Sequence, residues 1–147
     1  MKILVSACLM GVKCKYNGGD NLNPTIKELC EQNEYLCVCP ECLGGLSTPR
    51  YPSEIQDNKV INSNGEDVSQ QYNHGAQLVL NICEMENIDL AILKSKSPAC
   101  GFGFIYDGSF TKTLVRGNGV CAQLLLNHGY RVINSEDDKI ILNMMNI

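Results

Sequence analysis

The chain has 147 residues, which is enough for one domain with a buried core and too few for two domains of ordinary size. Hydrophobic residues make up 44% and charged residues 19%, without a run of like charges, and this composition excludes extensive disorder. The net charge of −4 provides no basic face for a nucleic-acid backbone and argues against polymeric DNA or RNA as a partner. We therefore predict a single folded domain over residues 1–147.

The N-terminal segment does not resemble a signal peptide. Residues 1–11, MKILVSACLMG, are apolar for only a few positions before Lys13 and Lys15, so the segment is shorter than the apolar region of a signal peptide. No apolar stretch reaches the length that spans a membrane. The sequence thus predicts a cytoplasmic protein without a membrane partner.

The first half of the chain alternates between strand and helix patterns. An apolar strand at residues 2–7 is followed by a turn-rich loop and then by a helix at residues 24–33, which begins with a proline. A second strand covers residues 35–39. Residues 46–64 show little periodicity and predict a long loop, with a short strand at residues 59–62.

The second half continues the alternation. Apolar residues at helical spacing predict a helix over residues 67–87 that starts from an Asp67 cap. The remaining predicted elements are a strand at 89–94, a loop at 95–103, a helix at 117–129, a strand at 130–134 and a helix at 135–147.

Strands that alternate with helices, and that are apolar throughout, indicate a parallel sheet covered on both faces. The predicted fold class is α/β, a small Rossmann-like or flavodoxin-like three-layer sandwich with a mainly parallel sheet. The C-terminal helix could pack within its own chain or mediate a dimer, so both a monomer and a homodimer are compatible with the sequence.

Cysteine usage is the unusual feature of the composition. The chain contains nine cysteines. An odd count without an export signal argues against a disulfide framework and for reduced thiols. Cys30, Cys83 and Cys121 lie inside helical patterns, where a free cysteine usually packs as a small hydrophobic residue.

Three other cysteines follow predicted strands. Cys8 comes directly after the first strand, Cys39 ends the second, and Cys100 lies in the loop after the third. The carboxyl ends of parallel strands form the edge where ligands bind in open α/β sheets. These thiols, which are far apart in the sequence, are therefore expected to converge.

The remaining cysteines and the two histidines carry weaker signals. Cys37 lies two residues before Cys39 in the predicted strand, so we expect it to be buried one pleat deeper. Cys14 and Cys42 lie on loops near the same edge, and each could be a ligand or a redox partner. His74 and His128 stand alone in helical patterns and are expected to be structural or solvated.

The spacing of the cysteines is compatible with two kinds of metal site. Zinc could be held by Cys39 and Cys42, which form a C-x-x-C pair, together with Cys8 and Cys100. Three thiolates could instead hold an iron–sulfur cluster and leave one iron open, and an open iron is a Lewis acid that can take sulfur from a substrate.

Five segments in order carry a family resemblance. They are CLMG at 8–11 with CKYNGG at 14–19, CPE at 39–41 followed by LGGL and TPR up to Arg50, KSKSPACG at 94–101, YDGSF at 106–110 and GNGVCAQLL at 117–125. Together they resemble the thiouracil desulfidase family, a former domain-of-unknown-function group related to the sulfur-removing module of a tRNA thiouridine desulfidase. The resemblance runs over nearly the whole chain and implies one desulfidase domain.

The resemblance implies a [4Fe-4S] cluster held by Cys8, Cys39 and Cys100, with one open iron. It also implies a hydrolytic desulfuration without net redox change, in which a thiolated pyrimidine such as thiouracil loses its sulfur as hydrosulfide. Glu41 and Ser97 match the family's acid and base residues. A small-molecule substrate is favoured over tRNA because the chain lacks the extra domain of the tRNA-acting relatives and is acidic.

Simpler interpretations exist for the same residues. Glu41 could cap a helix that starts after Pro40, and Ser97 before Pro98 could be a turn residue. Gly117 and Gly119 are more simply explained by helix capping than by anion binding. The chain also departs from the family pattern at Lys15, Asn17 and Ala99, so the resemblance does not fix substrate preference.

Two other functional classes remain compatible with the cysteines. One is a non-catalytic zinc- or cluster-binding module with a regulatory or sulfur-carrier role. The other is a thiol-redox enzyme that uses Cys39 and Cys42.

Overall fold

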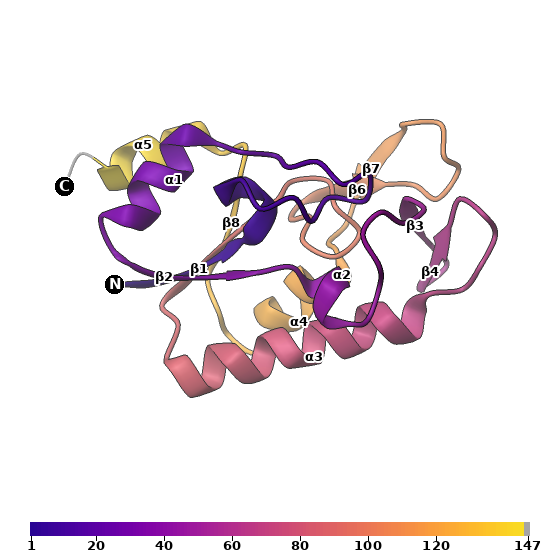
Figure 1. Cartoon of the computed structure of the whole chain (residues 1–147), viewed down its shortest axis with the longest axis horizontal. Helices are drawn as coiled ribbons and strands as arrows, with labels where there is room; N and C mark the ends of the chain where they lie inside the picture. Colours follow the sequence, from indigo (N-terminus) through magenta and orange to yellow (C-terminus); the bar gives the residue numbers. More distant parts are fainter. Residues whose placement is uncertain (146–147) are drawn as a thin grey trace.

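A parallel four-stranded sheet forms the centre of the computed structural model, which describes residues 1–145 (Figure 1). Its strands lie in the order β2-β1-β5-β8, and they are β1 (Lys2–Ser6), β2 (Glu34–Val38), β5 (Leu90–Leu93) and β8 (Val132–Asn134). In register, Leu4 of β1 pairs with Leu36 of β2 on one side and with Ala91 of β5 on the other. The predicted parallel sheet is confirmed.

Helices cover both faces of this sheet. Helices α1 (Pro24–Glu31) and α5 (Asp138–Met145) pack on one face, and α3 (Ser69–Glu86) and α4 (Val120–Asn127) pack on the other (Figure 1). Successive residues of β1 point to opposite layers, because Ile3 and Val5 join the core beneath α1 and α5 while Leu4 joins the core of α3 and α4. The predicted three-layer sandwich is therefore confirmed. Within residues 1–145, no helix combines the length and hydrophobicity needed to cross a membrane.

The exposure of β2 differs from that of the two central strands. Strands β1 and β5 are central, and Ile3, Leu4 and Val5 are fully buried. Strand β2 is an edge strand, and Cys37 in it is exposed. The expectation that Cys37 is buried is wrong, because the pleat places it on the same face as its partner Val5 but at the edge of the layer, where burial is incomplete.

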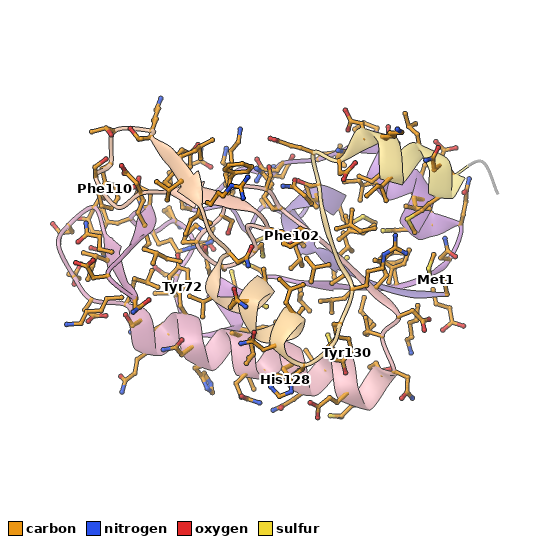
Figure 2. The ribbon with its side chains drawn as sticks, turned by 180° about the vertical axis from the view of Figure 1, so that it is seen from behind. Met1, Tyr72, Phe102, Phe110, His128 and Tyr130 are labelled. Carbon is orange, nitrogen blue, oxygen red and sulfur yellow. The ribbon has the colours of Figure 1, made fainter. Side chains whose placement is uncertain are left out.

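Two antiparallel hairpins extend from the sandwich. The first joins β3 (Ser53–Gln56) to β4 (Lys59–Asn62), and the second joins β6 (Phe104–Tyr106) to β7 (Leu114–Arg116). The predicted short strand at 59–62 is confirmed. The prediction of a loop over the rest of residues 46–64 is wrong at residues 53–56, which form β3. Both hairpins gather at the end of the molecule opposite Met1, where Figure 2 shows Phe110.

Element boundaries differ from the predictions by a few residues. The four predicted helices are confirmed and each is shorter than predicted, and residues 146–147 of the last one lie outside the described residues. Asp67 accepts a hydrogen bond from the backbone of Ser69 (2.9 Å), but Val68 occupies the position before the helix. The 3₁₀ turn η1 (Ala7–Met10) was not predicted, and the helix after Pro40 that the sequence offered as an alternative forms as α2 (Pro40–Leu43).

Candidate active site

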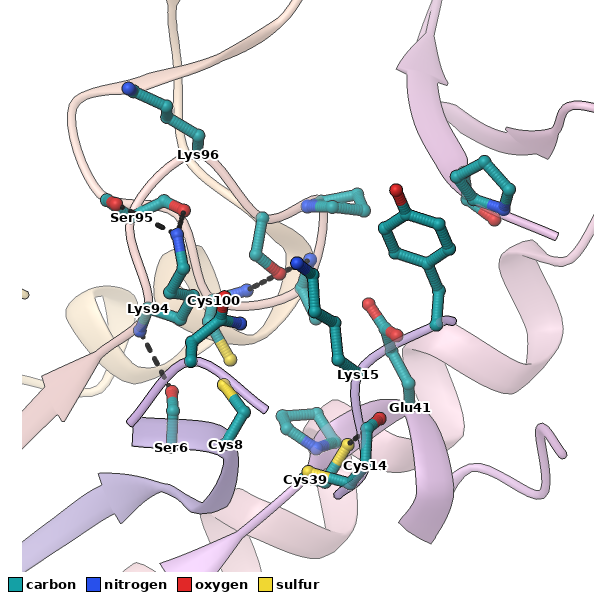
Figure 3. Close-up of a pocket in the computed structure, with 18 of the residues that line it drawn as sticks. Ser6, Cys8, Cys14, Lys15, Cys39, Glu41, Lys94, Ser95, Lys96 and Cys100 are labelled. Carbon is teal, nitrogen blue, oxygen red and sulfur yellow. Dashed lines mark hydrogen bonds between the residues drawn. The ribbon is translucent and has the colours of Figure 1, made fainter. Parts of the chain in front are cut away.

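A cavity of about 520 Å³ opens at the carboxyl ends of β1, β2 and β5 (Figure 3). All five residues predicted for the site line it, and they are Cys8, Glu41, Cys39, Ser97 and Cys100. Cys14 lines it as well, whereas Cys42 does not appear among the lining residues. The topology of the parallel sheet therefore brings together thiols from three distant parts of the chain.

Cys8 lies in η1, directly after β1, and is half-buried. Burial raises the pKa of its thiol, while a hydrogen bond with the Asn21 side chain lowers that pKa. Asn21 is held in place because its backbone N–H donates to the carbonyl of Cys8 (3.0 Å). The loop after η1 thus returns to Cys8 and supplies its polar partner.

Cys39 occupies the position before α2, where Pro40 begins the helix. A hydrogen bond with the Cys14 thiol and burial both raise the pKa of Cys39, and the same bond lowers the pKa of Cys14. The backbone N–H of Cys42 donates to the Cys39 thiol and opposes this rise. Figure 3 shows the Cys14 and Cys39 side chains next to each other.

Cys100 is 5% exposed, and this burial raises the pKa of its thiol. A hydrogen bond with the buried hydroxyl of Ser6 lowers that pKa. The Ser6 oxygen also accepts the backbone N–H of Lys94 (2.9 Å), so its own proton is available to the thiol. Ser6 therefore joins the ends of β1 and β5 to Cys100.

The loop that carries Cys100 is fixed against α4. The backbone N–H of Val120 donates to the carbonyl of Pro98 (2.8 Å), and that of Cys121 donates to the carbonyl of Ala99 (2.9 Å). A side chain at Gly119 would place its Cβ 2.5 Å from Ala99. The start of α4 is thus occupied by the loop, which supports helix capping rather than anion binding for this glycine segment.

Glu41 takes part in a buried ion pair. Its carboxylate forms an ion pair with Arg50, whose Nε donates at 2.8 Å, and accepts a second bond from the hydroxyl of Tyr72 (3.0 Å). Arg50 also donates to the carbonyl of Cys14 (2.8 Å). The Glu41 and Arg50 side chains are 13% and 8% exposed. The Glu41 carboxylate therefore binds the side chains of Arg50 and Tyr72 and does not cap the start of α2.

Ser97 has the turn role that its position before Pro98 suggested. Its Oγ accepts hydrogen bonds from the backbone N–H groups of Ala99 (3.1 Å) and Cys100 (3.0 Å). Both acceptor sites of the hydroxyl are thereby used, and its proton is left to donate. The turn role and a role toward a ligand are therefore compatible.

Cations are frequent around this cavity. Lys96 forms an ion pair with Glu136 (3.5 Å) and Arg50 pairs with Glu41. The Nζ of Lys94 donates to the carbonyl (3.0 Å) and to the hydroxyl (3.2 Å) of Ser95. Desolvation lowers the pKa of Lys94, and the neighbouring Cys8 raises it. The other cations that line the cavity are Lys15 and Lys112.

The other cysteines and the histidines lie away from this chemistry. Burial raises the pKa of Cys30 to about 12 and that of Cys83 to about 11, as the predicted core packing requires. Cys121 is also fully buried. Both His74 and His128 are exposed on or next to helices, in agreement with the predicted solvated role.

Sequence reasoning missed Tyr72 and Lys94 as lining residues and assigned no role to Arg50. Tyr72 fits the apolar pattern of α3, which hides its polar contact with Glu41. Arg50 lies in the quoted TPR segment, but nothing in the spacing reveals its partner. Among residues 1–145, no group of three or more His, Cys, Asp or Glu side chains is arranged to hold a metal ion. Cys8, Cys14, Cys39 and Cys100 all line the cavity.

Comparison with known proteins gives a consistent result. The model of the 2-thiouracil desulfurase family matches residues 3–137. The uncharacterized protein YbbK of Bacillus subtilis (strain 168) is 41% identical over 150 residues, which cover 95% of this chain and 99% of that protein. The structure of the [4Fe-4S]-dependent thiouracil desulfidase TudS superposes with a TM-score of 0.88 at 36% identity, covering 99% of both chains. This chain therefore belongs to the 2-thiouracil desulfurase family.

Proposed function

We propose that this protein is a thiouracil desulfidase that hydrolyses thiolated pyrimidines with the help of a [4Fe-4S] cluster. The observation that carries the proposal is the convergence of Cys8, Cys39 and Cys100 on one cavity at the carboxyl edge of the sheet. In the reaction, water replaces the thiocarbonyl sulfur, so that one carbonyl, one hydrosulfide and one proton are formed. No electron is gained or lost.

The thiols around the cavity fit such a cluster. Thiolates are the usual ligands of iron–sulfur clusters, and Cys8, Cys39 and Cys100 all line this cavity. Each candidate ligand has a hydrogen-bond partner, namely Asn21 for Cys8, the Cys42 backbone for Cys39 and Ser6 for Cys100. Such partners orient ligands and tune the bound group. When bound, a cluster with one open iron supplies a Lewis acid for the sulfur of the substrate.

Glu41 and Ser97 are proposed to move protons. The Glu41 carboxylate is oriented by Arg50 and Tyr72 at the wall of the cavity, where it can accept a proton from the attacking water. The Ser97 hydroxyl accepts two backbone bonds and so keeps its proton free to donate to the pyrimidine ring.

The same proposal extends to substrate, location and domain organisation. A cavity of about 520 Å³ suits a free pyrimidine, which supports a small molecule over tRNA. All nine cysteines are free thiols, which supports a reducing, cytoplasmic location. Residues 1–147 are proposed to form one desulfidase domain.

The test is hydrosulfide release from 2-thiouracil and 4-thiouracil by anaerobically reconstituted protein. Cys100→Ala is expected to abolish release, while the control Cys42→Ser retains it because the Cys42 side chain lies outside the cavity lining. Release by Cys100→Ala at the wild-type rate would refute the assignment of the cluster ligands. No release by wild-type protein with full iron content would refute the substrate.

The same samples separate the alternatives. A zinc module would contain zinc and no iron after anaerobic purification. A thiol-redox enzyme that uses Cys39 and Cys42 would lose activity in Cys42→Ser. No observation in the structure favours either one over the desulfidase.

A further inference from the structure

Lys94 lies at the centre of the edge where the thiols meet. It follows β5 directly, and its backbone is bonded to Ser6 at the end of β1. Figure 3 shows Lys94 beside Cys8 and Cys100 on one side of the cavity, with Cys39 and Glu41 on the other. The half-buried lysine is thus built into the wall next to the two thiols.

The carboxylate that acts on the charge of Lys94, Glu136, is itself paired with Lys96 and offsets that charge only in part. Both hydrogen bonds from Nζ go to neutral oxygens of Ser95. In contrast, two other cations of the cavity, Arg50 and Lys96, each have a carboxylate partner. Among residues 1–145, Lys94 forms no ion pair. A half-buried ammonium normally needs an anion to offset its lost hydration, and the third N–H of Lys94 remains to bind one.

We propose that Lys94 binds the sulfur that leaves the substrate, holding it as hydrosulfide against its ammonium group beside Cys8. This inference rests on the proposed function, which makes hydrosulfide the product at this cavity. The thiolates of Cys8, Cys39 and Cys100 repel a further anion, and a fixed cation nearby offsets part of that repulsion. Lys94 is the cation that the fold places beside two of those thiols.

The charge of Lys94 has two measurable consequences. A cation near an anionic site favours the more negative state, so it strengthens hydrosulfide binding and also favours reduction of a bound cluster. We expect Lys94→Met to weaken hydrosulfide binding about tenfold. A tenfold change in the reduction equilibrium would lower the midpoint potential by about 59 mV for one electron.

The experiment titrates reconstituted protein with sodium hydrosulfide and, separately, with a reductant, while the absorption of the cluster is followed. Lys94→Arg keeps the charge, so its hydrosulfide affinity should stay within about threefold of the wild-type value, whereas that of Lys94→Met should fall outside this range. Lys112→Met is the matched control, because Lys112 lines the same cavity but is exposed. Lys94→Gln replaces the methionine variant if that variant does not retain iron.

The possible outcomes separate this inference from the proposed function. An unchanged hydrosulfide affinity and potential in Lys94→Met would overturn the role of Lys94, and so would equal changes in Lys94→Met and Lys94→Arg. Neither readout requires turnover of thiouracil, so loss of the proposed substrate would leave this test intact. A wild-type protein that takes up no iron would overturn the proposed function, and with it the hydrosulfide site.

Discussion

Gly75 controls the position of the segment that carries Cys39 and Glu41. It lies in α3 at the contact with α2, and it has no positive φ that would demand glycine. A methyl group at this position would overlap the carbonyl oxygen of Pro40 and lie 2.8 Å from its carbonyl carbon. Carbon atoms in contact are normally at least about 3.5 Å apart, so α2 would have to move by at least about 0.7 Å.

This geometry opposes the intrinsic preference of a helix. In an exposed helix, Gly→Ala stabilises by about 1 kcal/mol, whereas overpacking a core contact costs about 1–3 kcal/mol or more. The atoms that meet the new methyl group of Gly75→Ala belong to backbone, which cannot rotate away. We expect a net loss of about 2 kcal/mol in the free energy of unfolding, together with reduced iron content, because Cys39 and Glu41 flank the displaced Pro40.

Urea unfolding of the metal-free proteins, followed by circular dichroism, measures the loss, and iron analysis of reconstituted protein measures the effect on the site. Asn73→Ala is the matched control, since Asn73 is exposed on the same helix and its replacement should be neutral or slightly stabilising. A Gly75→Ala protein that is as stable as wild type and binds the same amount of iron would refute the argument.

Three further predictions concern the ion pair and the thiols. Arg50→Met should cost about 3–5 kcal/mol in urea unfolding because it strands the buried Glu41 carboxylate; adding Glu41→Gln should recover part of that loss, and simple additivity would contradict the pairing. Burial raises the pKa of Cys83 to about 11, so its stabilisation is complete below the ordinary thiol pKa of about 8.5 and is lost as the pH rises toward 11. The stability difference between wild type and Cys83→Ala should therefore shrink by roughly 2 kcal/mol between about pH 7 and pH 10, and a constant difference would rule this out. Cys37→Ser and Cys42→Ser change exposed thiols and should leave iron content unchanged, while a loss of iron in either would add that residue to the ligand set.

The sandwich was predictable because its strands and helices carry periodic patterns. Strand β5 is buried at all four positions and is a continuous apolar run, which is typical of a parallel strand covered on both faces. Strand order is not encoded in this pattern, and this is why Cys37 in the edge strand was misplaced. The β3–β4 hairpin was half missed, although Asp57 and Asn58 both adopt positive φ at its tight turn.

The convergence of Cys8, Cys39 and Cys100 was predictable for a different reason than the contacts of Glu41 were. Cys8 and Cys39 directly follow strands, so the topology of a parallel sheet fixes their convergence without any knowledge of side-chain packing. The contact between Arg50 and Glu41, and that between Tyr72 and Glu41, depend on how loops fold back over α2 and α3. No local pattern in the sequence records such tertiary pairings.

The net charge of the chain and the charges that line the cavity differ in sign. A net charge of −4 is unfavourable for binding a polynucleotide backbone. The lining of the cavity has the opposite balance, because it carries three carboxylates, Glu41, Glu54 and Glu136, and five cations, Lys15, Arg50, Lys94, Lys96 and Lys112. Both hydrogen bonds from the Nζ of Lys94 go to neutral oxygens of Ser95, and the Glu136 carboxylate that acts on its charge is paired with Lys96. An acidic protein can therefore carry a locally cationic cavity that suits a small anion.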